Sequence, residues 1–301
     1  MNAGSTSLKL HLVRDGESEP VDGFVAADAV GHRVVHGGAR FTQPALLDPE
    51  VEAEIERLTV LAPLHNTRAL EAIRRAHEAL PGVPQVAVFD TAFHRTLSRA
   101  AAAYAVPERW REEWGVRRYG FHGISVQWVT QQIQVPRLVV CHLGGGCSLT
   151  AVRNGRSVDT TMGFSPLEGV PMATRSGSVD PGALLYLLRE RLLGADELER
   201  QLEHESGLAG LSGGGSGDVR EASPFALDVF VHRVAAAVGA MAAACDGVDV
   251  LAFTGGIGEH ADDLRGRIVE RVRFLGDFRV EVVPAREELV IAHETLRTLA
   301  G

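Results

Sequence analysis

Three short apolar runs along the chain predict buried strands. They span 86–89, 138–143 and 248–253, and each ends at a loop that opens with an Asp-Thr pair, a triple glycine or a Thr-Gly-Gly sequence. A continuous apolar run of this length, bounded by turn residues, is typical of a strand that is covered on both faces. We therefore expect a sheet whose strand ends carry polar and glycine-rich loops.

A hairpin is predicted after the second of these strands. The segments 147–152 and 156–161 flank the Asn-Gly dipeptide at 154–155, which is a strong hairpin signal. A similar order of glycine loop, strand-like residues and Asp-Gly occurs near the start, with the Asp-Gly at 15–16. Two structurally similar halves would produce this sequence similarity, and so would a chance likeness between two turns.

Helical spacing of apolar residues predicts helices at 66–80, 181–193, 225–245 and about 261–272. Strands, a hairpin and helices mixed in this way favour the α/β class. The Gly/Ser-rich stretch 206–218 has the composition of a flexible linker, but a loop that approaches a ligand closely has the same composition.

The composition narrows the class of protein. The 301 residues correspond to about two domains, and 45% hydrophobic with 23% charged residues is typical of a folded globular protein. A net charge of -9 and a pI near 5.7 have the wrong sign for binding a phosphate backbone, so we expect no nucleic-acid partner.

The expected environment is the cytoplasm. No stretch reaches the ~20 consecutive apolar residues of a membrane span, and the first residues lack the layout of a secretion signal. We therefore expect no membrane partner. The three cysteines, Cys141, Cys147 and Cys245, cannot all pair, which excludes a disulfide framework.

The 33 glycines are concentrated in a few dense loops. Backbone N–H groups in such loops form concave anion sites, for which phosphate is the usual ligand. None of the loops has the G-x-x-x-x-G-K-[ST] pattern, so a P-loop is excluded. The loops together favour a nucleotide or polyphosphate site.

Five polar residues lie at the edges of apolar runs: Arg33, His65, Asp90, His122 and Arg175. Each alone is better explained as an ordinary solvated or hydrogen-bonded residue. Together, and close to glycine or proline, they are typical of functional residues on loops at strand ends.

Ten motifs, in order, give the chain a family resemblance. They are N-A-G-S-T-S-L-K at 2–9, G-H-R-V-V-H-G-G at 31–38, L-A-P-L-H-N at 61–66, F-D-T-A-F-H at 89–94, R-Y-G-F-H-G at 118–123, H-L-G-G-G at 142–146, T-M-G-F-S-P-L-E-G at 161–169, T-R-S-G-S-V-D-P at 174–181, F-T-G-G-I-G-E at 253–259 and E-E-L at 287–289. The chain resembles the acetate kinases, within the acetate and sugar kinase, Hsc70 and actin superfamily.

The resemblance implies an α/β protein with two ribonuclease H-like lobes around a central cleft, the actin-like ATPase fold. The first lobe would contain residues 1–92 plus 287–301, on the acceptor and metal side. The second would contain residues 93–286, on the nucleotide side. A homodimer is also expected.

The implied reaction is reversible transfer of the γ-phosphoryl group of ATP to acetate or a related short-chain carboxylate. By resemblance, Arg33 and Arg175 hold the acceptor and the moving phosphoryl group, His122 hydrogen-bonds that group, and His65 supports them. Asn2, Asp90 and Glu287 match the residues associated with magnesium, for which manganese is an alternative, and Asp90 is also counted as catalytic.

The resemblance also implies a nucleotide site and an acyl pocket. The predicted nucleotide-binding residues are Asn2, Ser5, Ser7, Lys9, His142, Gly144, Gly145, Gly146, Asp218, Val219, Arg220, Gly255, Gly256, Ile257 and Gly258. The predicted pocket for the acyl tail consists of Val35, Leu64, Phe121 and Pro166.

The chain departs from the usual family pattern at several positions. Gly145 stands in place of Asn, Gly256 in place of Ala and Val219 in place of an aromatic residue, and similar changes occur at Ala39 and Arg286. None removes a predicted catalytic group. Members usually have an apolar strand before N-A-G-S, so we expect the true start upstream of Met1 and, without that strand, Asn2 at a frayed end.

Three different readings of the function stay open at this point. A propionate kinase and a pyrophosphate-using relative would share most of these motifs. A catalytically inactive protein that binds a nucleotide or an acyl phosphate is the alternative from another class.

Overall fold

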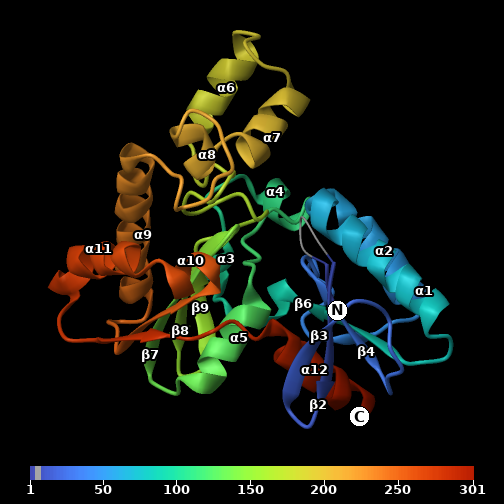
Figure 1. Cartoon of the computed structure of the whole chain (residues 1–301). Helices are drawn as coiled ribbons and strands as arrows, with labels where there is room; N and C mark the ends of the chain where they lie inside the picture. The colour runs from blue at the N-terminus through green and yellow to red at the C-terminus, as the bar shows by residue number, and fades with distance from the viewer. Residues whose placement is uncertain (4–7) are drawn as a thin grey trace. The chain divides into compact units, whose positions relative to one another are not determined.

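The chain forms two compact units that each combine helices and sheet (Figure 1). The computed structural model describes residues 1–3 and 8–301, without the side chains of Ala3 and Leu64. Unit 1 comprises Met1–Thr96, Ala103–Gln131 and Ala285–Gly301, and unit 2 comprises Leu97–Ala102 and Gln132–Pro284. The segment Ala103–Gln131, which we placed in the second lobe, therefore groups with unit 1, and the lobe limits themselves stay a prediction.

Unit 1 contains an antiparallel meander and a mixed sheet. The strands run in the orders β1-β2-β3 and β4-β6-β5, with β4 parallel to β6. Their bounds are β1 (Asn2–Ala3), β2 (Leu8–Arg14), β3 (Glu17–Val21), β4 (Val30–Val34), β5 (Ala45–Leu46) and β6 (Gln85–Phe89). The predicted strand 86–89 is thus confirmed as β6.

Two backbone hydrogen bonds link the first residues to β4. The amino group of Met1 donates to the Gly31 carbonyl at 2.6 Å, and the Arg33 N–H donates to the Met1 carbonyl at 3.0 Å. This alternation is the bond pattern of a parallel pair. Asn2 is therefore held beside β4, and the expectation of a frayed Asn2 is wrong.

Helices α1, α2, α5 and α12 of unit 1 pack on β4 and β6, and shorter helical segments surround them. Their bounds are α1 (Pro49–Arg57), η1 (Leu58–Leu61), α2 (Pro63–Ala79), η2 (Asp90–Thr96), α4 (Glu108–Glu112), α5 (Gly123–Gln132) and α12 (Glu287–Leu299). The start of α1 is encoded locally, because the Asp48 carboxylate accepts from the Val51 N–H at 2.8 Å and proline follows at the first helical position.

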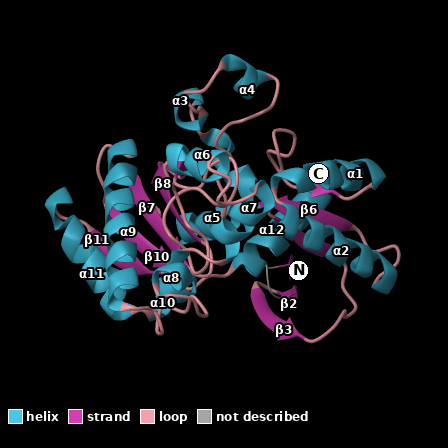
Figure 2. Ribbon diagram, turned by 90° about the horizontal axis from the view of Figure 1, so that it is seen from above, coloured by secondary structure: helices cyan, strands magenta, loops and turns pink. Residues whose placement is uncertain are grey.

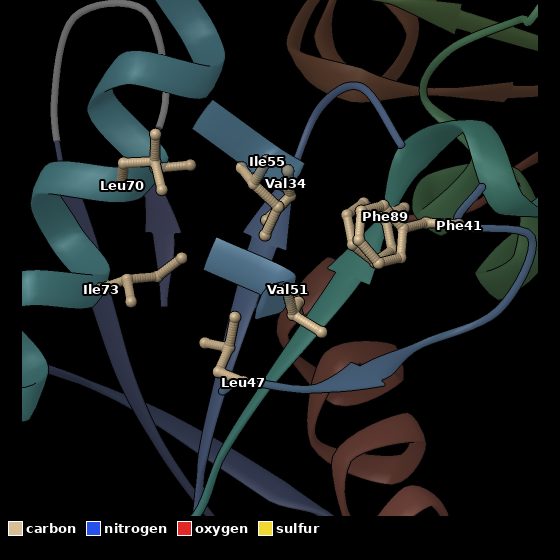
Figure 3. Packing of buried hydrophobic residues seen from close by; sticks show 10 residues of the cluster. Val34, Phe41, Leu47, Val51, Ile55, Leu70, Ile73 and Phe89 are labelled. Carbon is tan, nitrogen blue, oxygen red and sulfur yellow. The ribbon is translucent and has the colours of Figure 1, made fainter. Parts of the chain in front are cut away.

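Strand β6 is buried on both faces, as its continuous apolar run predicted. Ala87 and Phe89 belong to a cluster built from α1, α2 and β4, in which Phe89 stacks on Phe41 with ring centroids 4.5 Å apart (Figure 3). Val86 and Val88 lie on the other face, with residues of α5 and α12. The end of β6, where the sequence places Asp90, is therefore held from both sides.

Unit 2 contains one mixed sheet with the strand order β11-β10-β7-β8-β9. Strands β11, β10 and β7 are parallel, and β7, β8 and β9 are antiparallel. Their bounds are β7 (Arg137–Leu143), β8 (Cys147–Arg153), β9 (Arg156–Thr160), β10 (Val250–Thr254) and β11 (Arg279–Val282). The predicted strands at 138–143 and 248–253 and the predicted hairpin are confirmed within one or two residues.

The sequence similarity between the Asp-Gly segment at 15–16 and the Asn-Gly segment at 154–155 corresponds to two hairpins of the same kind. In β2–β3 the turn residues Asp15 and Gly16 have φ of 51° and 82°, and in β8–β9 Asn154 and Gly155 have 49° and 76°. Two consecutive positive φ values define the tight turn that matches strand twist, which explains the Asp-Gly and Asn-Gly sequences. With the bonds from Met1 to β4, both units share a core in which two parallel strands adjoin a three-stranded meander.

Long and short helices complete unit 2. Their bounds are α3 (Arg99–Ala102), α6 (Pro181–Arg189), α7 (Ala195–His204), α8 (Gly207–Leu211), α9 (Pro224–Ala244), α10 (Gly255–His260), α11 (Asp262–Val272) and η3 (Arg273–Leu275). The four predicted helices are present, although α2 starts earlier and α6 ends earlier than predicted. Helix α10 forms where we expected a loop at 254–259.

Within the described residues, α9 is long and apolar enough to cross a membrane by length and composition alone. In unit 2 it packs on β7, β8 and β9, and α11 packs on it (Figure 2). Phe230, Val234 and Val238 are fully buried on the helix. These contacts are those of a core helix, and a single helix of this kind is weak evidence for a membrane span.

We predict that Ile73→Ala lowers the free energy of unfolding by about 2–5 kcal/mol, because the fully buried Ile73 of α2 packs in the cluster around β6. Urea denaturation followed by circular dichroism measures the change. Val60→Ala is the control, since Val60 is 77% exposed. Equal loss in both variants would contradict the packing described for this cluster.

Candidate active site

A buried ion pair lies at the ends of the two central strands of unit 1. Arg33 is on β4, and Asp90 directly follows β6, which is parallel to β4. The Arg33 guanidinium donates to both Asp90 carboxylate oxygens, through Nε at 3.1 and 3.2 Å and through Nη2 at 2.6 Å. This two-pronged geometry fixes the plane of the guanidinium.

Asn2 and Glu287 complete a four-residue cluster, which we call the Arg33 cluster. Arg33 Nη1 donates to Asn2 Oδ1 at 3.1 Å and lies 3.4 Å from Glu287 Oε2. Asn2 Nδ2 donates to the same Glu287 oxygen at 2.8 Å. The structure thus brings together four of the predicted site residues, although Asn2 and Glu287 are 285 positions apart.

Burial determines the electrostatics of the Arg33 cluster. Burial opposes the charge on Arg33, but Asp90 and Glu287 outweigh it and raise the pKa of the guanidinium. Burial raises the pKa of the Asp90 carboxyl above its usual range, and Glu287 adds to the rise, whereas Arg33 acts against it. The Asp90 carboxylate therefore depends on a nearby cation.

The chemistry of the cluster fits a hard divalent cation. Two carboxylates and one amide oxygen are available, and Mg²⁺ typically takes one or two carboxylates together with substrate phosphate oxygens. Among the described residues there is no group of three or more His, Cys, Asp or Glu side chains that could hold a metal alone. The Arg33 cluster therefore supplies two carboxylates and one amide oxygen, which is fewer acidic ligands than a site built from protein side chains alone.

His122 is positioned by the close approach of α5 to Asp90. An ideal Cβ on Gly123 would lie 2.0 Å from the Asp90 carbonyl oxygen, so only glycine fits there. The Ile124 N–H donates to the Asp90 carboxylate, and the preceding His122 is buried with a φ of 57°. The glycine of the F-H-G sequence is therefore required locally by the close approach of α5 to the end of β6.

Three buried polar residues around this region were missed in the sequence. Burial lowers the pKa of His94 to about 4, so its neutral ring donates to the Phe121 carbonyl at 2.9 Å. The Asn66 side chain exchanges two hydrogen bonds, each of 3.0 Å, with the backbone of His36. All three stand inside the quoted motifs, and their polar character within apolar surroundings was the available signal.

The remaining predicted residues of unit 1 have less distinctive surroundings. His65 is half-buried in the first turn of α2, and Lys9 is exposed on β2. Val35 and Phe121 are buried, as expected of an apolar pocket, and the Phe121 ring lies edge-on to His36. Ser5, Ser7 and the side chain of Leu64 lie outside the described residues.

In unit 2 the two predicted glycine loops lie side by side. Residues 144–146 follow β7 and residues 255–258 begin α10 after β10, and these two strands are parallel neighbours. An ideal Cβ on Gly144 would be 3.7 Å from the Gly256 nitrogen. Gly255 has a φ of 80°, and a Cβ there would be 2.8 Å from the Leu143 carbonyl oxygen, so a side chain is excluded.

Arg175 lies in a loop that is held by part of the Gly/Ser-rich stretch. Its Nη1 donates to the Pro166 carbonyl oxygen at 3.3 Å, which joins two predicted site residues. The Leu208 and Ala209 N–H groups donate to carbonyls of residues 172 and 173 at 2.9 and 3.0 Å. The first half of 206–218 is therefore docked on the Arg175 loop, and the linker interpretation is wrong for it.

In the Asp218-Val219-Arg220 segment, the first and third side chains bind each other. Arg220 Nε donates to Asp218 at 2.9 Å, and this bond lowers the pKa of the Asp218 carboxyl to about 2. Both side chains belong to an exposed pair. In this arrangement the charge of Arg220 balances the charge of the Asp218 carboxylate.

Comparison with known proteins identifies the family. A model of the acetokinase family matches residues 17–295. The acetate kinase of Synechococcus sp. is 48% identical over 87% of this chain and 68% of its own length, and that of Halothermothrix orenii is 41% identical over 96% and 83%.

Comparison with solved structures points to the same family. The acetate kinase of Porphyromonas gingivalis superposes with a TM-score of 0.83 at 37% identity, over 90% of this chain and 78% of that one. A propionate kinase from Francisella tularensis superposes with a TM-score of 0.85 at 37% identity, over 89% and 79%. The predicted α/β fold class is confirmed, and the chain belongs to the acetokinase family.

Proposed function

We propose that this protein transfers the γ-phosphoryl group of ATP to acetate, or to a closely related short-chain carboxylate, and forms an acyl phosphate and ADP reversibly. The Arg33 cluster carries this proposal, because it combines a fixed guanidinium with two carboxylates at one site. Membership of the acetokinase family supports the same reaction class.

The proposed reaction requires positive charge around the reacting groups, and it requires no general base to ionise the acceptor. A carboxylic acid titrates near 4, so the acceptor is already an anion at neutral pH. The main obstacle is repulsion between that anion and the polyphosphate. Positioning and positive charge around an in-line transfer then account for catalysis. Arg33, Arg175 and His122 are the groups that we assign to this role.

Arg33 is suited to hold the acceptor and the moving phosphoryl group. Its side chain is 14% exposed, and its orientation is set by Asp90 before any substrate binds. A guanidinium whose rotation is already restricted loses less conformational entropy on binding an anion. We assign His65 a supporting role near this group.

Asn2, Asp90 and Glu287 would hold a magnesium ion, or manganese in its place. Bound there, the metal would neutralise phosphate charge. The residues themselves bring two oxygen anions and an amide oxygen to one point, and Arg33 keeps them in place in the protein alone. The gathering of two carboxylates and an amide oxygen around Arg33 is the observation that favours a divalent cation here.

The nucleotide would bind through the glycine-rich turns of unit 2. The backbone of residues 144–146 and 255–258, with His142, would contact the phosphates and adenosine, and Asp218, Val219 and Arg220 would lie beside the base and ribose. Ser5, Ser7 and Lys9 would add phosphate contacts. Open space around Gly145 and Gly256 leaves both backbone segments approachable.

A propionate kinase is the second candidate, favoured by the similarity to the Francisella tularensis protein. The pocket assigned to Val35, Leu64, Phe121 and Pro166 would decide between the acids. One methylene in an apolar pocket is worth only about 1–3 kcal/mol, so both acids should be substrates. A pyrophosphate-using enzyme and a catalytically inactive binding protein differ from both kinases in the products they form.

We also propose a cytoplasmic homodimer. Leu185, Tyr186 and Leu188 of α6 and the nearby Leu192 are exposed, which is a larger apolar group than single scattered side chains. Sedimentation equilibrium of the purified chain tests the dimer.

Hydroxylamine trapping of acyl phosphate tests the reaction. We expect product from acetate with ATP and Mg²⁺, and product from propionate with a kcat/KM within roughly 200-fold of acetate. Chelation of the metal should abolish product. The same assay with pyrophosphate tests that compound as the phosphoryl donor, and absence of product from folded protein with every C2 to C4 acid would favour an inactive binding protein.

Arg33→Ala should lower kcat by roughly 10³-fold or more, about 4 kcal/mol. It should also lower the free energy of unfolding by about 3–5 kcal/mol, because it leaves the buried Asp90 carboxylate without its cation. The double variant Arg33→Ala/Asp90→Asn should recover much of the stability and none of the activity.

Steady-state kinetics and urea denaturation measure the two effects separately. Arg57→Ala is the control, since Arg57 is an exposed arginine paired with Glu54 on α1. Near-normal turnover of Arg33→Ala would remove Arg33 from the mechanism.

A further inference from the structure

A row of polar side chains crosses the end of the sheet of unit 2. The register pairs Thr254 of β10 with His142 of β7, and His142 with Ser148 of β8. Residues paired across neighbouring strands point to the same face of a sheet, so these three side chains lie in one line. The row before it in the three strands is apolar.

This row lies at the base of both glycine loops. Residues 144–146 begin two positions after His142, and Gly255 directly follows Thr254. An ideal Cβ on Gly144 would lie 4.0 Å from His142 Nε2. The His142 ring, which is half-buried, is therefore next to the loop that we assign to the phosphates.

Thr254 is unusual within this row. The residue is fully buried, and no group in the described parts of the chain forms a hydrogen bond with its hydroxyl oxygen. By contrast, the buried hydroxyl of Thr150 on β8 pairs with the Thr160 hydroxyl at 3.0 Å. A buried hydroxyl without a partner costs stability, and an apolar group of the same shape avoids that cost.

We propose that Thr254 is a positioning residue for a nucleoside triphosphate. In the nucleotide-bound protein, its hydroxyl donates to one ring nitrogen of His142. That bond fixes the tautomer of a neutral imidazole and leaves the other N–H to donate to a phosphate oxygen. The inference rests on the proposed nucleotide site at the glycine loops and adds a role for a residue beneath them.

Thr254→Val and Thr254→Ser test this role in the full chain. Valine keeps the shape and removes the hydroxyl, so the ligand-free melting temperature should stay the same or rise, while the Kd for MgADP and the KM for ATP increase about five- to tenfold. Serine keeps the hydroxyl and should restore both constants to within about twofold of wild type. Calorimetric titration, kinetics and thermal unfolding supply the three readouts.

Thr150→Val is the matched control, with the opposite expectation. It removes a buried hydroxyl that is already paired, so the melting temperature should fall and the nucleotide Kd should stay unchanged.

Equal nucleotide affinity of wild type and Thr254→Val would overturn the inference. A weaker affinity that serine does not restore, together with a melting temperature lowered as in Thr150→Val, would also overturn it. Failure of the wild-type chain to bind any adenine nucleotide would instead contradict the proposed function, and the role of Thr254 would fall with it.

Discussion

The contact between Arg33 and Asp90 is the interaction on which the arrangement of unit 1 depends. Both groups are buried at the ends of parallel strands, and neither charge could stay there alone without a large desolvation cost. Asn2 and Glu287 fix the guanidinium from a second side, and the Ile124 N–H fixes the Asp90 carboxylate from a third. The β1 and β4 strands and the α5 and α12 helices are therefore tied to one point through charge and hydrogen bonding.

Unit 2 has the same strand arrangement as unit 1 but different loops at the strand ends. Its sheet also places parallel strands beside a meander, but the loops that follow β7 and β10 are glycine-rich. Gly255 has a φ of 80° beside Leu143, where a side chain would not fit, and its N–H donates to Glu259 Oε1 at 3.1 Å. Unit 1 thus holds fixed charges at the ends of β4 and β6, and unit 2 holds glycine-rich turns at the ends of β7 and β10.

The side chains of unit 1 would then need to move little during the reaction. The acceptor carries its own charge, the guanidinium is already oriented, and the neutral His94 holds the backbone just before His122. Preorganised groups of this kind need little rearrangement when charge moves during the reaction. Burial raises the pKa of Asp90 and Arg33 acts against this rise, so a second cation would stabilise the carboxylate further.

The sequence by itself determined the local elements, because apolar runs, Asn-Gly and Asp-Gly turns and helix signals depend on neighbours in the chain. Strands β6 and β7, the β8–β9 hairpin and helix α9 were predicted to within one or two residues. The resemblance named Arg33, Asp90, Asn2 and Glu287 as site residues. Only the tertiary structure decided that they contact one another, that Ala103–Gln131 joins unit 1 and that the Thr254 hydroxyl is buried without a partner among the described residues. Those outcomes depend on strand register and on helices packed across long sequence separations, which no local pattern encodes.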